Sequence, residues 1–464
     1  MMNFRDYKKD PALIAFFAIG FIATYSLKII LYKVLGNPST LIFLILLFFF
    51  CHLKFKSSTK SLRSLEIGCM TSIIFVNLMV IIQIVKSNFL HPGEWDFLCF
   101  FMDGHVAANG LNFYHPQNYT EVYKHIILPF TPDSEFITEK INVGFQYFPA
   151  NIFNFLFLGY FDFKTAHIVW IILNTICFLI CILLVWQIFL KREKIFGIII
   201  AIGLFFLLPG TRTAIYFEQS TFIFMLPLLL AWKYREKLFS GVWLTIGFCL
   251  KPILGILFIY PILRKKWKVL FYFIASLIII SLITIAVFGT DTFFSFFSEN
   301  PNVKNLPNFV YYEGVNQSLL ATILRLTSFD LDSGSPLLNP IFLFAAGIIS
   351  ISTFYLVFKL DKLDSDLALA IIVIASLLLY PGSINSYSPL IIPLIGLLIS
   401  YASLEKIDYR LTFLIISFIY SIMFFNPFIS HLTFWIILMI IALFKTGIIH
   451  SDKITLMKFS TINN

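Results

Sequence analysis

Apolar segments of membrane-spanning length follow one another along most of this chain and are separated by short polar stretches. A helix that crosses the hydrocarbon core of a bilayer needs about 20 predominantly apolar residues. On this basis we expect twelve transmembrane helices, at 11–34, 39–53, 67–87, 165–190, 195–209, 213–232, 269–289, 336–358, 366–381, 388–404, 409–425 and 428–447. The pattern predicts an all-α, polytopic membrane protein with a single integral domain, 1–464.

Two further apolar segments do not have the form of a simple span. Residues 146–160 cover about half a membrane and contain a proline. Residues 239–263 are interrupted by Lys251-Pro252, and proline removes a backbone donor and disfavours helix at the preceding residue. We expect 239–263 to form a broken hairpin that returns to its own side of the membrane.

The basic residues predict the orientation, because Lys and Arg gather in cytoplasmic loops. If the N-terminus is cytoplasmic, 146–160 does not cross and the hairpin returns, then most Lys and Arg face the cytoplasm, including KREK at 191–194 and RKKWK at 264–268. Both termini are then cytoplasmic. The net charge of +9 follows from this topology, and no nucleic-acid partner is needed to explain it. We expect a multi-pass protein of the cell membrane, in a bacterium the inner membrane.

The composition supports a membrane protein and excludes an ordinary soluble one. Hydrophobic residues make up 59% of the chain and charged residues 13%, whereas about a quarter of the residues in a soluble domain are charged. The six cysteines and the histidines show no metal-site spacing. No metal, cofactor or protein partner is predicted.

The polar stretch 93–116, in the first large outer loop (89–145), is the main candidate for chemistry. Asp96 and Asp103 are seven positions apart, so both would project from one face of a helix. Their neighbours are strongly apolar, and we expect this helix to lie in the membrane interface with one polar face. A carboxylate there could act as a general base toward a hydroxyl. Alternatively, the two acids are a helix cap and a solvated surface residue.

Other polar side chains interrupt apolar segments. Glu218 and Gln219 lie inside one such segment, where an ionisable residue suggests function unless it is paired, and Arg212 is the candidate partner. Lys251 could meet a phosphate anion, snorkel to the surface or pair with Glu218.

The second outer loop, 290–335, contains Asn316, Gln317 and Arg325. These groups suit sugar hydroxyls or a phosphate, or they form a helix cap with a helix-end arginine. The two loops share the predicted outer face with 211–220 and 381–388. Such convergence is typical of a membrane enzyme, and equally of a channel vestibule.

Taken in order, these motifs resemble glycosyltransferase family 87 from about residue 65 to 400. The matching residues are Asp96-Phe97, Gly110-Leu111-Asn112-Phe113-Tyr114, Tyr147-Phe148-Pro149, Glu218-Gln219, Ser240-Gly241, Lys251-Pro252, Asn316-Gln317-Ser318-Leu319 and Arg325. Two departures stand out. The glycine of a Gly-Gln element is replaced at Glu218, and a Pro-x-Ser-Trp-x-His element lacks its Trp and His at 381–387.

The resemblance implies a GT-C glycosyltransferase architecture with Asp96 as catalytic base on the first outer loop. It implies that 146–160 forms a juxtamembrane helix on the outer surface. Asp103 is not part of the family pattern. The resemblance also implies a polyprenyl-phosphate sugar donor, as in α-mannosyltransferase-like relatives, and a lipid- or glycan-linked acceptor. We therefore predict an inverting transferase. Asp96, assisted by the cations Lys251, Arg325 and Arg212, would act at the outer face among membrane lipids.

The sequence agrees with a lipid donor because it lacks a segment the size of a nucleotide-binding domain and a strand–GxGxxG–helix unit. A transporter or flippase of lipid-linked sugars remains an alternative and would be built from inverted repeats with mid-membrane charges. A polymerase or ligase subunit of the cell envelope and a catalytically silent GT-C-like protein are further alternatives.

Overall fold

The structure is a computed structural model. It describes residues 78–88, 96–124, 144–299, 316–327, 336–360, 363–404 and 426–448, together with a few isolated positions between 15 and 75. The predicted spans 39–53 and 409–425, nearly all of 11–34 and part of 67–87 lie outside these residues. In the described part the elements are helical, and one isolated bridge joins Asn316 to Ile384.

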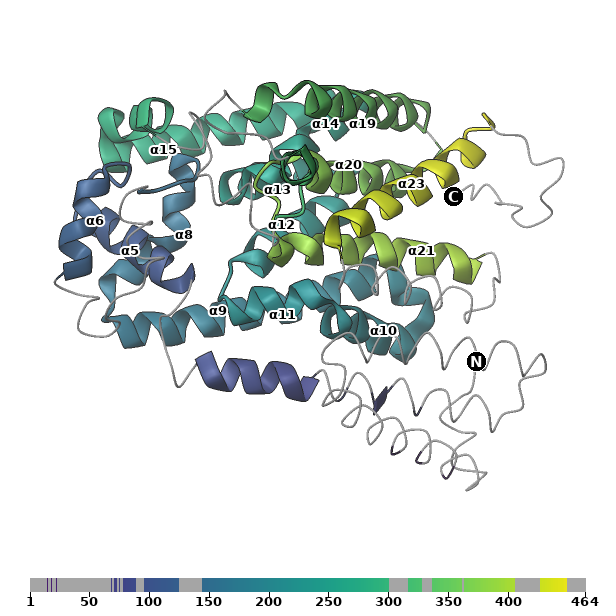
Figure 1. Ribbon diagram of the computed structural model, residues 1–464, viewed down its shortest axis with the longest axis horizontal. Coiled ribbons are helices and arrows are strands. Elements are labelled where there is room, and N and C mark those ends of the chain that lie inside the picture. The colour runs from purple at the N-terminus through teal and green to yellow at the C-terminus, as the bar shows by residue number, and fades with distance from the viewer. Residues whose placement is uncertain are drawn as a thin grey trace.

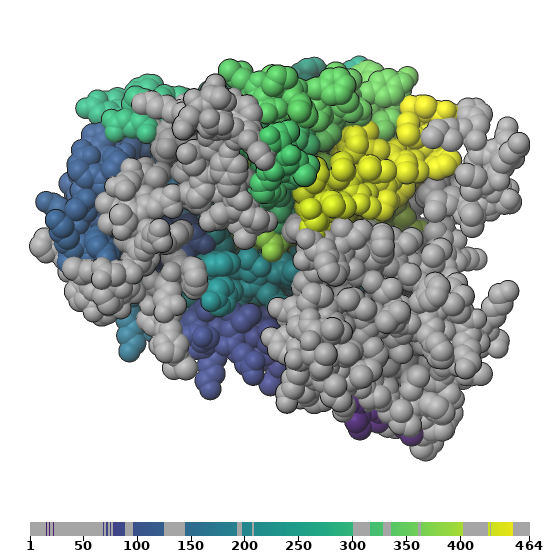
Figure 2. Space-filling model, in the orientation of Figure 1, coloured from purple at the N-terminus to yellow at the C-terminus, as the bar shows by residue number. Residues whose placement is uncertain are grey.

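Most of the longer helices run roughly along the long axis of the molecule (Figure 1). The first group is α5 (Asp96–Ala108), α6 (Pro116–Val122), η2 (Pro149–Ile152), α8 (Phe153–Leu156), η3 (Phe157–Tyr160) and α9 (Phe163–Val185), which η4 (Trp186–Leu190) continues. The second is η5 (Lys191–Glu193), α10 (Lys194–Leu207), α11 (Pro209–Tyr216), α12 (Thr221–Lys233), α13 (Ser240–Leu250), η6 (Pro252–Phe258), α14 (Ile259–Leu263) and α15 (Trp267–Glu299). The third is α18 (Leu319–Thr327), η8 (Pro336–Leu338), α19 (Pro340–Lys359), α20 (Ser365–Leu379), η9 (Asn385–Ile391), α21 (Ile392–Leu404) and α23 (Pro427–Lys445). On the face shown in Figure 2, α23 (yellow) lies against the green segments that contain α19 and α20.

Four helices of the described part are long and apolar enough to cross a membrane: Phe163–Leu190, Trp267–Glu299, Pro340–Lys359 and Phe428–Lys445. A fifth span would arise if Gly197–Phe206 and Pro209–Tyr216, bent by 62°, were one broken helix. Helices α12, α20 and α21 are apolar but shorter. The described residues therefore do not reproduce the expected twelve spans.

The expected continuous span at 213–232 is wrong. Helix α11 ends at Tyr216, and α12 begins only at Thr221. Between them Glu218 adopts a φ of 55°, a left-handed conformation that interrupts a right-handed helix. No glycine or proline marks this break, but the four consecutive polar residues from Glu218 to Thr221 interrupt the apolar pattern there.

The segment 239–263 turns back on itself at Lys251. Lys251 is extended, with φ −149° and ψ 124°, and separates α13 from η6. Gly255 in η6 packs against the Phe248 ring of α13. Beyond the second half, the Lys266 ammonium lies 2.6 Å from Glu236, which precedes the first half. The two ends of the hairpin therefore lie together, and Lys251 is at its tip.

Helix α5 is covered on nearly every side, by α6, α8, η3 and α9. The expectation that it presents one polar face is therefore wrong, whereas its position in the membrane interface stays a prediction. Residues 149–160 form three short helical turns against it, and a Cβ added to Gly104 would lie 2.2 Å from the carbonyl oxygen of Phe155. The backbones of α5 and these turns are in direct contact because Gly104 and Gly159 have no side chains there.

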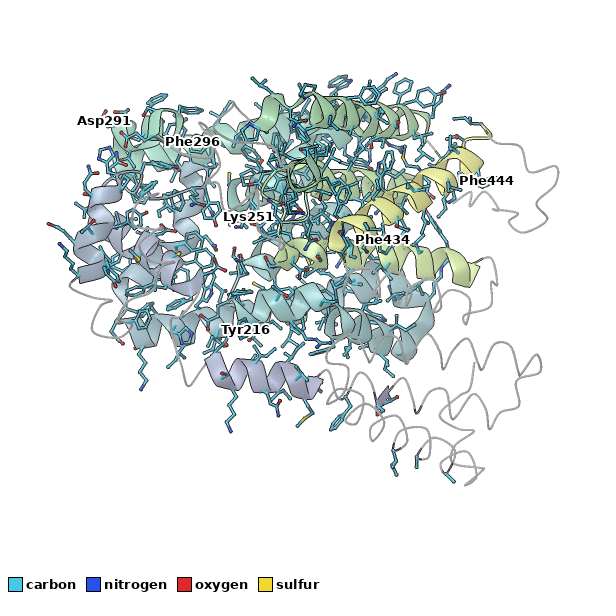
Figure 3. The ribbon with its side chains drawn as sticks, viewed as in Figure 1. Tyr216, Lys251, Asp291, Phe296, Phe434 and Phe444 are labelled. Carbon is cyan, nitrogen blue, oxygen red and sulfur yellow. The ribbon has the colours of Figure 1, made fainter. Side chains whose placement is uncertain are left out.

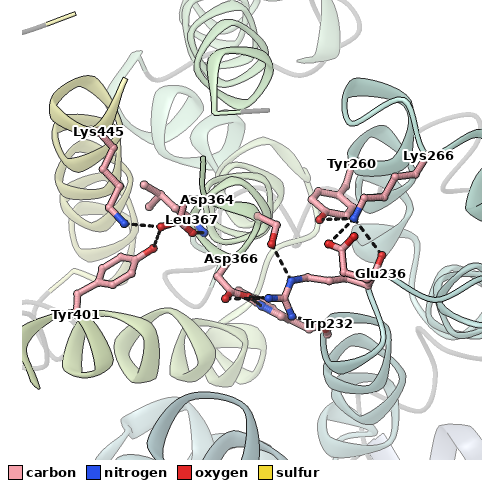
Figure 4. Close-up of polar contacts among 11 residues, drawn as sticks. Trp232, Glu236, Tyr260, Lys266, Asp364, Asp366, Leu367, Tyr401 and Lys445 are labelled. Carbon is pink, nitrogen blue, oxygen red and sulfur yellow. Dashed lines mark hydrogen bonds and ion pairs between the residues drawn. The ribbon is translucent and has the colours of Figure 1, made fainter. Parts of the chain in front are cut away.

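A polar cluster closes the end of the bundle opposite α5 and α6 (Figure 4). Its ion pairs are Arg235–Asp366 at 2.9 Å, Lys266–Glu236 at 2.6 Å and Lys445–Asp364 at 2.5 Å. The hydroxyl of Tyr401 and the indole N–H of Trp232 donate to the same two aspartates. Loops that are far apart in the sequence thus share one charged end.

Replacing Gly104 by alanine should destabilise the fold, because the new methyl group would overlap the Phe155 carbonyl. We expect a loss of about 1–3 kcal/mol in the free energy of unfolding, measured as a lower melting temperature in detergent. Gly347→Ala on α19 is the matched control, since nothing lies within 4 Å of a Cβ there. Equal melting temperatures for the two variants would contradict the close backbone contact.

Candidate active site

Asp96 is the first residue of α5, and its carboxylate accepts a hydrogen bond from the side-chain amide of Gln219. A helix N-terminus stabilises a negative charge, because its backbone N–H groups point toward it. Gln219 is 7% exposed and lies in the break between α11 and α12. The pair therefore joins two helix breaks from distant parts of the chain.

Glu218 is paired with His167 and not with Arg212. The Oε1 atom of Glu218 lies 2.6 Å from Nε2 of His167 on α9, and both side chains are almost fully buried. The backbone carbonyl of Glu218 accepts a hydrogen bond from the indole N–H of Trp170 at 2.9 Å. The proposed Glu218–Arg212 ion pair is thus wrong in its partner. Arg212 itself is partly buried on α11, two residues after Gly210.

Lys251 is held by two phenols. It is 3% exposed, and its ammonium donates to the hydroxyls of Tyr147 and Tyr387, each at 3.0 Å. Its Nζ also lies 4.2 Å from the centre of the Tyr147 ring, a cation–π distance. Figure 3 shows Lys251 in the interior of the molecule. Neither snorkelling nor pairing with Glu218 describes this lysine.

The electrostatics of Tyr147 connect Lys251 with Asp96. Burial raises the pKa of the Tyr147 hydroxyl well above its usual range, while Lys251 lowers it and Tyr387 and Asp96 raise it. The charge of Asp96 acts on Tyr387 as well. The ammonium is bonded to both phenols, and the charge of Asp96 acts on them; we call these four residues the Asp96–Lys251 site.

Tyr114 is hydrogen-bonded to the backbone of Tyr147, one of the residues of this site. It is 1% exposed, and its hydroxyl donates to the backbone carbonyl of Tyr147 at 2.7 Å. Burial raises the pKa of Tyr114, with a contribution from Asp103 in the same direction. Tyr114 thus fixes the backbone whose side chain contacts Lys251.

Asp103 lies away from the Asp96–Lys251 site. Seven helical residues correspond to about 10 Å along the helix axis, so the two carboxylates cannot share one substrate atom. Asp103 is fully buried, and its Oδ1 accepts from the hydroxyl of Tyr119 on α6 at 2.8 Å. This environment ties α5 to α6.

Asn316, Gln317 and Arg325, from the loop predicted to lie on the outer face, form a separate network with the stretch 381–388. The Asn316 amide donates to the carbonyl of Pro381 at 2.7 Å, and the Arg325 guanidinium donates to the carbonyl of Asn316 at 2.9 Å. The N–H of Gln317 donates to Ser383, and its side-chain oxygen accepts from Ser388. Tyr387, which directly precedes Ser388, contacts Lys251, so this network adjoins the Asp96–Lys251 site.

Three residues of the arrangement had no predicted role: Tyr147, Tyr387 and His167. Tyr147 belongs to the Tyr-x-Pro motif, which was the available signal for it. Tyr387 is the last residue of the stretch 381–387 that lacks the Trp and His, and His167 lies in a long apolar helix with no motif around it. Among the described residues no group of three His, Cys, Asp or Glu could hold a metal ion.

These features define a helical membrane protein with a carboxylate, an amide and a buried lysine gathered at helix breaks. The model of glycosyltransferase family 87 matches residues 145–381, about half of the chain, and the chain belongs to this family. It is therefore a glycosyltransferase. Neither the curated proteins nor the solved structures gave a match.

The matched region contains Tyr147, Gln219, Lys251 and the second-loop residues Asn316 and Gln317, but not Asp96 or Tyr387. Asp96 precedes it and Tyr387 follows it. Contacts in the structure connect both of them to residues inside the matched region.

Replacing Tyr119 by phenylalanine should lower stability, because it removes a donor from the buried Asp103 carboxylate. A loss of about 1–3 kcal/mol in the free energy of unfolding is expected, measured by thermal unfolding in detergent. Tyr160→Phe is the control, since Tyr160 is 69% exposed. If both variants have the melting temperature of the wild type, the Tyr119 hydroxyl does not stabilise the buried Asp103.

Proposed function

We propose that the protein transfers a sugar from a polyprenyl-phosphate donor to a lipid- or glycan-linked acceptor at the outer face of the cytoplasmic membrane, with inversion at the anomeric carbon. The observation that carries this proposal is the Asp96–Lys251 site, which combines a carboxylate oriented by Gln219 with a buried ammonium. Glycosyl transfer from a phosphate-linked donor needs both: a base for the acceptor and a cation for the leaving group.

In the proposed reaction Asp96 accepts the proton of an acceptor hydroxyl as that oxygen attacks the anomeric carbon. The bond between this carbon and the phosphate oxygen breaks, and polyprenyl phosphate leaves with the electron pair. Attack from the face opposite to the leaving group inverts the configuration. The Gln219 amide restricts the rotation of the Asp96 side chain, and this orientation supports a base of fixed geometry.

Lys251 is the proposed partner of the leaving phosphate. An ammonium has three N–H donors, and two of those on Lys251 point to Tyr147 and Tyr387. The third suits a phosphate oxygen, and the two phenolic O–H groups can add further donors. The aromatic rings around the ammonium keep water away and strengthen its interaction with an anion.

The remaining predicted residues have supporting roles in this proposal. Asn316 and Gln317 order the polypeptide next to Tyr387 and would shape the wall that meets the sugar. Arg325, which is bound to the Asn316 carbonyl, and Arg212 on α11 would add positive potential for the phosphate. Asp103 would hold the fold of the first outer loop.

The charged end of the bundle supports the proposed orientation. Arg235, Arg264, Lys266 and Lys445 lie at the end opposite α5 and α6, and basic residues favour the cytoplasmic side. The Asp96–Lys251 site would then open toward the outer face, where sugars carried on polyprenyl phosphate are available and nucleotide sugars are not. A GT-C architecture with both termini in the cytoplasm agrees with this arrangement.

Asp96→Asn should reduce transfer by at least about 100-fold, because general-base assistance contributes roughly 10²–10⁴ in rate. The measurement is transfer of labelled sugar from a panel of polyprenyl-phosphate sugars in reconstituted membranes. Asp103→Asn is the matched control and should keep most of the activity per folded molecule. Unimpaired transfer by Asp96→Asn would remove the proposed base, and movement of lipid-linked sugar without a glycosidic product would favour a flippase.

Lys251→Gln should lower kcat by about 10²–10³-fold, as expected when one donor to a developing oxyanion is removed. Lys164→Gln, at the exposed start of α9, should leave transfer unchanged. The same assay at saturating donor separates kcat from KM. A Lys251→Gln protein with normal kcat would contradict the leaving-group role.

A further inference from the structure

Glu218 occupies a backbone conformation that side chains disfavour. Its φ of 55° lies in the left-handed region, where glycine is the ordinary residue because it has no Cβ. Its N–H donates to the carbonyl of Ile215, and the N–H of Gln219 donates to that of Ala214. These hydrogen bonds terminate α11. Helix ends of this kind commonly have glycine at the left-handed position. A glutamate at this position has to be held by contacts made elsewhere.

His167 supplies the main contact. Its Nε2 lies 2.6 Å from Oε1 of Glu218, and the two side chains are 2% and 6% exposed. Trp170, one helical turn along α9, donates its indole N–H to the Glu218 carbonyl. Both the side chain and the backbone of the strained residue are therefore fixed to one rigid helix.

The same histidine also contacts α5. The ring of His167 packs against Phe97, with ring centres 4.7 Å apart, and Phe97 directly follows Asp96. On the other side, Glu218 directly precedes Gln219, whose amide donates to Asp96. His167 therefore lies against the neighbours of both members of the Asp96–Gln219 hydrogen bond.

We propose that His167 and Glu218 are positioning residues that hold the Gln219 amide against the catalytic base Asp96. This inference rests on the proposed function, in which Asp96 accepts the proton of the acceptor. The His167–Glu218 contact fixes the left-handed turn, the turn directs the Gln219 side chain to Asp96, and the His167 ring fixes the first turn of α5. Misplacing a catalytic group by about 1 Å can cost 100-fold in rate.

The test compares variants that separate the stability of the pair from its effect on geometry. His167→Ala leaves the buried Glu218 side chain without its hydrogen-bond partner, so it should be both less stable and less active. His167→Ala combined with Glu218→Gly removes the pair and also the backbone strain. This double variant should regain stability but lack the anchor for Gln219. His167→Gln retains an N–H donor for Glu218 and should rescue activity.

The measurements are kcat and KM for transfer from a polyprenyl-phosphate sugar in reconstituted membranes, with the melting temperature of each variant. The double variant should melt near the wild type yet show kcat lowered about 10–100-fold at nearly unchanged KM. His167→Gln should lie within about 5-fold of wild-type kcat. His115→Ala is the matched control, because it breaks a second His–Glu pair, with Glu299, that is about one-third exposed and on other elements.

A double variant that regains both stability and kcat would overturn the inference, because the pair would then be structural only. A raised KM with normal kcat would overturn it as well, since it would place the pair in substrate binding. Asp96→Asn separates the two proposals. If that variant is fully active, the proposed base is wrong; if it is inactive while the double variant is normal, only the positioning role is wrong.

Discussion

Interruption of helices inside an apolar interior is the constraint on which the site depends. The backbone groups of a continuous helix are satisfied within the helix, whereas a helix end or break leaves N–H and carbonyl groups for other partners. Here each polar group of the site lies at a helix end or break. Asp96 begins α5, Gln219 follows the left-handed Glu218, and Lys251 is the extended residue between α13 and η6.

These interruptions have a cost that the surrounding residues offset. Breaking a helix leaves backbone donors and acceptors to be satisfied. Trp170 donates to the carbonyl of Glu218, and the N–H of Leu254 donates to that of Lys251. The charge of Lys251 is met by two hydroxyls and by aromatic faces. Catalytic geometry and backbone satisfaction are thus provided by the same contacts.

The sequence predicts these breaks unequally. The break at Lys251-Pro252 is predictable because proline cannot continue a helix with its full hydrogen bonding. The break at Glu218 is not, because glutamate normally avoids a positive φ and no neighbouring glycine or proline marks it. The boundaries of α9 and α19 follow from apolar length. The burial of α5 cannot be predicted from apolar length, because it depends on the contact of Gly104 with residues 149–160.

The residues of the candidate site likewise fall into those that the sequence predicts and those that it does not. Asp96, Gln219 and Lys251 could be predicted because carboxylate, amide and ammonium groups stand out in apolar surroundings. His167 could not be assigned, because its role depends on a partner 51 positions away in the sequence. Tyr387 could not be assigned either: the stretch 381–387 to which it belongs lacks the expected Trp and His, and only the fold brings its hydroxyl to Lys251.

The charged end of the bundle also has a consequence for how the protein is made. Asp364 precedes α20, but its cation, Lys445, is on α23. During synthesis α20 is therefore translated before the lysine that pairs with its neighbouring aspartate. Arg235, by contrast, is already present when Asp366 arrives. Within the described residues, this charged cluster is therefore complete only after α23 has docked against α20.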